Sequence, residues 1–148
     1  EFGSAKFVFI GPDEKGLFKD IKDKRIINLN NVTDSEKTSA LAACDLLCLP
    51  SKYEVFPATI LEAWSFKKPV IVSNIEYLRA VVDDGVNGLL VKRDPTEIAG
   101  GIITLFRNRS MRDKMGSQGY ERVIRNYNKD RISNQTEELL ISLNYDGV

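Results

Sequence analysis

The sequence predicts an α/β fold: a Rossmann-like parallel sheet with helices on both faces, followed by a helical C-terminal tail. Short apolar runs, typical of buried strands, alternate with longer amphipathic segments, typical of helices, as far as residue 91. Clusters of glycine, proline, asparagine and aspartate separate the two kinds of segment. From residue 94 onward the pattern is helical throughout. Strands that alternate with helices favour a parallel sheet, because parallel strands need long crossover connections.

The predicted strands are short apolar runs bounded by turn-forming residues. Phe7-Val8-Phe9-Ile10 stops at Gly11-Pro12, and the run from Asp45 to Leu49 is closed by Pro50. A short apolar run with such a boundary is typical of a strand that is buried in a sheet. We therefore expect strands at residues 5–10, 25–29, 45–49, 69–73 and 89–91.

The predicted helices follow recognisable start signals. Thr33-Asp34-Ser35-Glu36 has the spacing of a capping box, in which threonine and glutamate each bond the other's backbone N–H. Pro57 fits the first position of a helix, where its missing N–H costs nothing. Asp94-Pro95-Thr96-Glu97 and Ser110 begin two further helices. We expect helices at residues 13–22, 33–43, 57–66, 76–83, 94–107, 110–126 and 130–143.

Length and composition limit the domain count and the function class. The 148 residues suffice for one domain, which we assign to residues 5–148, because Glu1-Phe2-Gly3-Ser4 is typical of a cloning remnant. Basic and acidic residues number 21 each, so nothing indicates a nucleic-acid partner. The absence of histidine excludes a histidine general base, a catalytic triad and an imidazole metal site. Cys44 and Cys48 are interpreted as reduced core thiols.

The apolar segments are too short to span a bilayer, and the sequence shows no secretory signal. We therefore expect a cytoplasmic location and no membrane contact through these residues. Membrane association of a full-length enzyme remains an alternative.

The segment from Ser51 to Trp64 carries the strongest functional signal. It places Glu54 in a loop and Glu62 on the second turn of a helix whose first N–H groups, at Ala58 and Thr59, have no partner inside the helix. Such a helix start attracts phosphate. Glu62 lies on the face of Ala58, about 6 Å further along the axis, within reach of a ribose. The alternative is that both glutamates are ordinary solvated charges.

Several linked motifs resemble one family. In order, they are Tyr53-Glu54-Val55-Phe56-Pro57, Leu61-Glu62-Ala63, Lys68-Pro69-Val70-Ile71-Val72-Ser73 and Asp83-Asp84-Gly85-Val86-Asn87-Gly88-Leu89-Leu90-Val91. Together they resemble the nucleotide-binding half of the retaining glycosyltransferases of the GT-B fold, family 4. The resemblance covers Asp45 to Val91.

The resemblance implies a role for each residue of the Glu54–Glu62 segment. Glu62 would hold the ribose hydroxyls of a nucleotide, and Glu54 would act as the catalytic residue that holds the donor sugar. The backbone N–H groups of Phe56, Ala58 and Thr59 would bind sugar and phosphate oxygens. Pro57 is a familiar variant at its position, whereas Val55 replaces a glycine and narrows the available backbone conformations.

A second turn is implicated by the same resemblance. Relatives read the nucleotide base through backbone atoms of the turn that corresponds to Asn30 to Thr33, which places Val32 in the base-binding set. A basic residue soon afterwards often assists, and Lys37 is the candidate. The alternative for Lys37 is an exposed helix lysine.

The implied activity is transfer of a hexosyl group from a nucleoside-diphosphate sugar, linked to UDP or GDP, to a glycan, lipid or other hydroxyl acceptor, as in polysaccharide biosynthesis. No metal and no cofactor are expected. The chain would be a partial domain that lacks the first strand and helix and the N-terminal acceptor domain, so we expect it to be inactive alone. The alternatives are a GT-B nucleotide-sugar epimerase and a non-catalytic nucleotide-binding or protein-binding module.

Loss of the first strand would leave two strand edges without partners. Unpaired backbone groups at buried edges are costly. We expect the strands at Phe7–Ile10 and Leu46–Leu49 to pair directly, with pairing to a second copy in a strand-exchanged dimer as the alternative.

Overall fold

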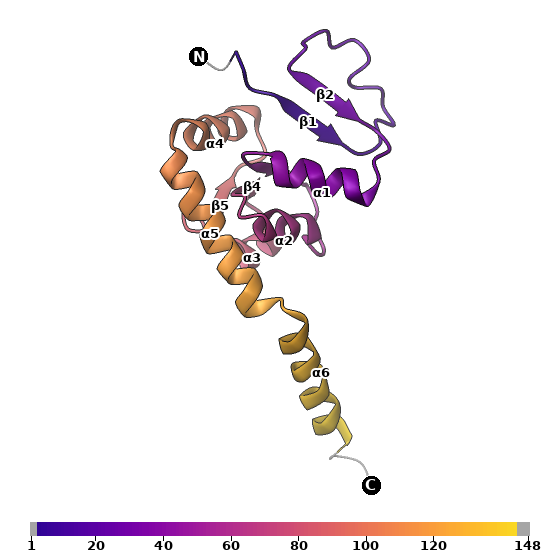
Figure 1. The fold of residues 1–148 in the computed structure, drawn as a ribbon, viewed down its shortest axis with the longest axis vertical. Coiled ribbons are helices and arrows are strands. Elements are labelled where there is room, and N and C mark those ends of the chain that lie inside the picture. The colour runs from indigo at the N-terminus through magenta and orange to yellow at the C-terminus, as the bar shows by residue number, and fades with distance from the viewer. Residues whose placement is uncertain (1–2, 145–148) are drawn as a thin grey trace. The chain divides into compact units, whose positions relative to one another are not determined.

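The computed structural model describes residues 3–144, in two compact units, Glu1–Ala40 and Leu41–Val148 (Figure 1). In the N-terminal unit β1 (Phe7–Ile10) pairs in parallel with β2 (Ile26–Leu29). Helix α1 (Asp34–Ala43) begins in this unit and ends in the next. The predicted capping box at its start is confirmed, since Glu36 Oε2 accepts the Thr33 N–H at 2.8 Å and Thr33 Oγ1 accepts the Glu36 N–H at 3.3 Å.

The helix predicted at residues 13–22 is wrong, because that segment forms turns. The carboxylate of Asp13 accepts the N–H groups of Leu17 at 2.7 Å and Phe18 at 3.1 Å, which offers the backbone an alternative to helical bonding. Gly16 adopts φ of 60°, a left-handed conformation that interrupts a right-handed helix. Leu17, Phe18 and Ile21 have the spacing of one helix face, but the turns that Asp13 and Gly16 stabilise form instead.

The C-terminal unit is built on a three-stranded parallel sheet in the order β3 (Leu47–Leu49), β4 (Val70–Ser73), β5 (Gly88–Val91). Its helices are α2 (Ala58–Ser65), α3 (Glu76–Val81), α4 (Pro95–Arg107), α5 (Arg109–Asn126) and α6 (Lys129–Asn144). Parallel strands with a helical C-terminal end confirm the predicted α/β class. Helix α4 begins as predicted, because the Asp94 carboxylate accepts the N–H groups of Thr96 and Glu97.

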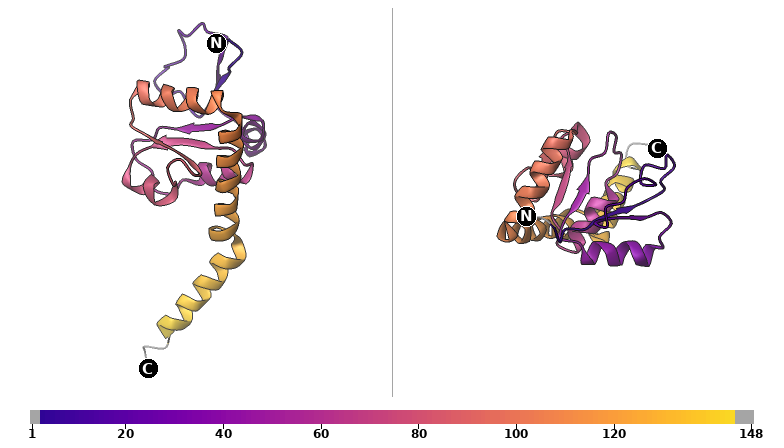
Figure 2. Two further views of the ribbon diagram at one scale, coloured as in Figure 1. Left: turned by 90° about the vertical axis from the view of Figure 1, so that its left-hand side faces the viewer. Right: turned by 90° about the horizontal axis from the view of Figure 1, so that it is seen from above.

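The sheet of the C-terminal unit carries a core on each face. Val70 and Val72 of the central strand pack with Trp64 of α2 and Leu78 of α3. Ile71 points to the opposite face, because side chains alternate along a strand, and it packs with residues from α4, α5 and β5, namely Leu105, Met115 and Val91. Figures 1 and 2 show α4 on one side of the strands and α2 with α3 on the other, so the prediction of helices on both faces is confirmed.

Two glycines of α5 allow this helix to lie directly on α2. A Cβ atom at Gly116 would stand 1.8 Å from the Lys67 carbonyl oxygen, and one at Gly119 would stand 2.1 Å from Trp64 Cδ1. Lys67 follows the end of α2 with φ of 55°, and its N–H donates to the Trp64 carbonyl at 2.8 Å. A residue that follows a helix end in the left-handed conformation is usually glycine, because a side chain strains this conformation. Here Lys67 adopts it, and the chain then turns towards β4.

The expected pairing of the strands at Phe7–Ile10 and Leu46–Leu49 is wrong, because β1 and β3 belong to separate sheets. All four side chains of β1 are exposed. Helix α6 leads away from the sheet of its unit, and its side chains from Arg131 to Ser142 are exposed (Figure 1). Within residues 3–144, no helix combines the length and apolar character needed to cross a bilayer.

Candidate functional site

The candidate site lies on the loop that joins β3 to α2. Strands β3, β4 and β5 are parallel, so their carboxyl ends, at Leu49, Ser73 and Val91, share one edge of the sheet. Open α/β sheets bind ligands beyond this edge. The loop after Leu49 leads directly to the start of α2, which puts the predicted phosphate-binding helix end where the fold favours a ligand.

The start of α2 leaves one amide available. Helix α2 begins at Ala58, one residue later than predicted, with Pro57 buried just before it. The Ala58 N–H donates to the Phe56 carbonyl at 2.9 Å, and the Ile60 N–H donates to the Pro57 carbonyl at 2.9 Å. The Thr59 N–H has no backbone acceptor among the residues that the structure describes. Thr59 is therefore the amide of this helix start that is best placed to meet an anion.

Glu54 lies in an otherwise exposed loop. Its side chain is half-buried, and its Oε1 accepts the N–H of Val55 at 3.2 Å. Its neighbours face solvent, with Tyr53 and Val55 each 79% exposed and Phe56 63% exposed. Glu54 is therefore flanked in the sequence by exposed aromatic and apolar side chains.

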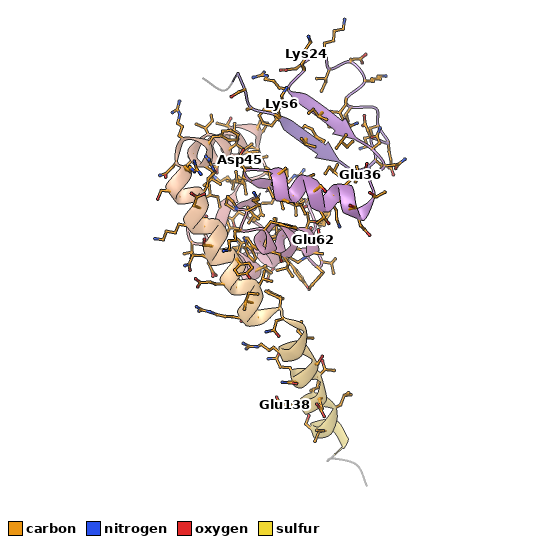
Figure 3. The ribbon with its side chains drawn as sticks, in the orientation of Figure 1. Lys6, Lys24, Glu36, Asp45, Glu62 and Glu138 are labelled. Carbon is orange, nitrogen blue, oxygen red and sulfur yellow. The ribbon has the colours of Figure 1, made fainter. Side chains whose placement is uncertain are left out.

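Glu62 projects from α2 one helical turn after Ala58 and is half-buried (Figure 3). Trp64, two residues later, is fully buried in the core, so Glu62 and Trp64 point to different sides of the helix. The inner face of α2 is apolar, since Ile60 and Trp64 are fully buried and Leu61 packs against them. The buried face of α2 therefore fixes the direction in which Glu62 can point.

The other two predicted residues belong to the N-terminal unit. Val32 is half-buried in the turn before α1. Lys37 lies in α1, and its Nζ is 3.8 Å from Asp34 Oδ1. The structure thus gathers Glu54, Phe56, Pro57, Ala58, Thr59 and Glu62 on one loop and helix of the C-terminal unit. Their roles, and those of Val32 and Lys37, remain predictions.

Neither cysteine of the chain is placed to act as a nucleophile. Burial raises the pKa of both thiols, at Cys44 and Cys48, above the usual range for cysteine, which keeps them protonated near neutral pH. Between residues 3 and 144, no three His, Cys, Asp or Glu side chains gather in a way that could hold a metal ion.

The turn from Asp83 to Gly88, which is part of the motif that ends at Val91, also contacts α2 through its buried residue Asn87, and sequence reasoning did not predict this contact. The Nε1–H of Trp64 donates to the carbonyl of Asn87 at 3.0 Å, and Arg122 of α5 forms an ion pair with Asp83. The sequence did contain a signal, because an asparagine between two glycines at a turn indicates a specific backbone conformation. That signal does not reveal which element the turn supports.

This arrangement defines an α/β domain with a candidate ligand site at the carboxyl edge of its sheet. Comparison with known families assigns it more narrowly. Residues 1–122 match the family of Glycosyl transferases group 1. The chain belongs to this family, as the resemblance predicted.

Characterised and uncharacterised relatives agree with this assignment. An uncharacterised glycosyltransferase of Methanocaldococcus jannaschii is 34% identical over 58% of this chain. A phosphatidyl-myo-inositol mannosyltransferase of Mycobacterium leprae is 31% identical over 72% of this chain. The matched regions are 25% and 29% of those two proteins, so the chain spans less than a third of their length.

Solved structures share the fold. HepE of Anabaena, solved with UDP and glucose, is 25% identical over 93% of this chain and 40% of its own, with a TM-score of 0.82. A C-terminal domain of a group 1 glycosyltransferase (LpcC) from Francisella tularensis is 28% identical over 72% of this chain and 56% of its own, with a TM-score of 0.65. Both neighbours confirm the GT-B type of Rossmann-like fold.

Proposed function

We propose that this chain is the donor-binding portion of a retaining glycosyltransferase that uses a nucleoside-diphosphate sugar. The observation that carries the proposal is the Glu54–Glu62 segment, which places two carboxylates and an available helix-start amide at the carboxyl edge of the sheet. The presence of UDP and glucose in HepE supports a nucleotide sugar as the ligand. The proposed reaction moves a hexosyl group from a UDP-linked or GDP-linked donor to a hydroxyl of a glycan, lipid or other acceptor.

The proposal gives each residue the role that the family resemblance implies. Glu62 accepts hydrogen bonds from the ribose hydroxyls, and the Thr59 N–H donates to a phosphate oxygen at the helix start. Glu54 accepts from the hydroxyls of the sugar. Val32 contacts the base through its backbone, and Lys37 assists. The reaction needs neither a metal nor a cofactor, because the leaving group is stabilised by cationic side chains contributed from outside these residues.

The complete enzyme would add the missing parts of the site. We propose that it supplies the first strand and helix of the domain and an acceptor-binding domain, and that it acts in the cytoplasm. The length of the relatives supports this proposal, because the matched regions are less than a third of those proteins.

The test is a screen of the complete protein and of this 148-residue chain against a panel of UDP-linked and GDP-linked sugars. We expect sugar transfer by the complete protein with at least one donor, and none by the short chain, because it would lack the acceptor domain. Epimerisation of the sugar in the donor, without its transfer to an acceptor, would indicate a nucleotide-sugar epimerase instead. Strong transfer by the short chain would contradict its assignment as a donor-binding portion.

Glu54→Gln is expected to slow transfer more than it weakens nucleotide binding. The substitution keeps the shape of the side chain but removes the charge that faces the sugar, whose interactions strengthen in the transition state. The measurement compares kcat for transfer with the affinity for the free nucleotide in the complete protein. An equal loss for the free nucleotide and the nucleotide sugar would show that Glu54 does not face the sugar.

A further inference from the structure

The turn from Asp83 to Gly88 is held in one conformation by a buried asparagine. Asn87 is 2% exposed, and its side-chain Oδ1 accepts the N–H of Asp83 at 2.9 Å while its Nδ2 donates to the Asp83 carboxylate at 3.3 Å. Gly85 turns the chain with φ of 74°. A Cβ atom at Gly88 would stand 2.7 Å from Val70 Cγ2, so the turn lies tightly against the central strand. Its backbone is therefore fixed relative to the sheet.

The same turn is joined to two helices. The carbonyl of Asn87 accepts the indole N–H of Trp64 at 3.0 Å, which attaches the turn to the buried face of α2. Arg122 of α5 forms an ion pair with Asp83 and donates to the Ala80 carbonyl at 3.1 Å. The side chain of Asn87 thus orients its own carbonyl towards Trp64, and α5 braces the turn from the other side.

The hydrogen bond to Trp64 and the packing of the buried face together fix how α2 is rotated about its axis. The helix has no side-chain cap at its start, so its rotation depends on the packing and hydrogen bonding of its buried face. Glu62 and Trp64 are two residues apart, or about 200° around the helix. A rotation of about 10° would move a carboxylate that lies about 6 Å from the axis by about 1 Å. A displacement of that size is enough to disturb a binding site.

We infer that Asn87 is a positioning residue for donor binding, which acts through Trp64 to hold Glu62 in place. The inference rests on the proposed function, since it concerns the same donor site. Asn87 itself is buried and does not touch the ligand. Its effect should therefore appear in donor affinity and should depend on Trp64.

The test is a double-mutant cycle of Asn87→Ala and Trp64→Phe in the complete protein, with calorimetric titration of UDP and GDP. Each single substitution should weaken binding of the preferred nucleotide by about three- to tenfold, which corresponds to one hydrogen bond. The double variant should lose no more than the larger single loss, because Asn87→Ala acts by misplacing the backbone carbonyl that accepts the indole N–H, and Trp64→Phe removes that N–H. Trp64→Phe keeps the aromatic ring, so it tests the contact even if Asn87→Ala does not fold.

A spectroscopic measurement reports on the contact itself. Trp64 is the one tryptophan of this chain, so selective 15N labelling and the Trp64→Phe variant identify its indole resonance. In Asn87→Ala this resonance should move upfield and exchange faster with solvent. An unchanged indole resonance in Asn87→Ala would overturn the inference.

The matched control is Leu105→Ala, which removes a fully buried side chain from the core on the opposite face of the sheet. It should lower the melting temperature and leave nucleotide affinity unchanged when binding is measured well below that temperature. Equal loss of affinity in Leu105→Ala, or additive losses in the cycle, would overturn the inference and leave the proposed function standing. Failure of the wild-type protein to bind either nucleotide would overturn the proposed function together with the inference.

Discussion

Gly116→Ala is expected to lower the free energy of unfolding by about 1–3 kcal/mol or more, the usual cost of overpacking. The added Cβ would stand 1.8 Å from the carbonyl oxygen of Lys67, a backbone atom that cannot rotate away as a side chain would. Lys67 is already in a left-handed conformation, so the turn after α2 has little freedom to adjust. The helices α2 and α5 must move apart, and chemical denaturation at equilibrium measures the loss.

The matched control is Gly100→Ala in α4. A Cβ atom at Gly100 would meet no atom within 4 Å, and the residue is exposed inside a helix. Replacing such a glycine by alanine usually stabilises a helix by about 0.5–1 kcal/mol. We therefore expect the two glycine-to-alanine changes to have opposite signs. Equal stability of Gly116→Ala and the wild type would show that α5 does not lie on α2 as closely as described.

Much of the C-terminal unit could be predicted from the sequence because local pattern and tertiary structure agree there. The apolar runs ending at Leu49 and Ser73 are strands, and the Asp94 carboxylate at the start of α4 accepts the hydrogen bonds that its residue type predicts. Ile60 and Trp64, four residues apart, both lie on the buried face of α2, as helical spacing requires. In each case the residue types favour one local structure, and that structure is the one that the fold contains.

The errors arose where a local pattern is compatible with two different structures. Leu17, Phe18 and Ile21 have helical spacing, but the nearby aspartate and glycine stabilise turns instead, and periodicity alone does not include those competitors. The pairing expected for the strands at Phe7–Ile10 and Leu46–Leu49 depended on how distant segments meet, which no local pattern describes.

The candidate site also contains residues that the sequence predicts and residues whose role depends on distant contacts. Glu54 and Glu62 could be proposed from the sequence because they lie in motifs that resemble those of a known family, whereas glutamates near a helix start are common as solvated charges. Asn87, Gly116 and Gly119 could not, because their importance lies in contacts with residues far away in the chain. Motifs along the sequence therefore predict residues that could meet a ligand, and they do not predict the distant contacts that hold α2 and the turn before β5 together.

Glu62→Ala is expected to weaken binding of the nucleoside-diphosphate donor by about 1–3 kcal/mol, the usual loss for hydrogen bonds to a charged group. The carboxylate lies one turn beyond the helix start, where Thr59 offers its amide to phosphate, so removal of Glu62 should affect the ribose contact alone. Glu62→Gln keeps one acceptor oxygen and should lose less. Calorimetric titration of the complete protein with UDP, GDP and their sugars measures both losses.

The control is Glu121→Ala, which removes an exposed glutamate of α5 that pairs with Arg125 at 3.1 Å. Exposed ion pairs contribute little, so this variant should bind the donor as the wild type does. The contrast separates a local ribose contact from a general loss of negative charge, because both variants remove one carboxylate from a helix of the same unit. Unchanged donor affinity in Glu62→Ala would remove α2 from the donor site, since its helix start and its carboxylate are proposed to bind one ligand together.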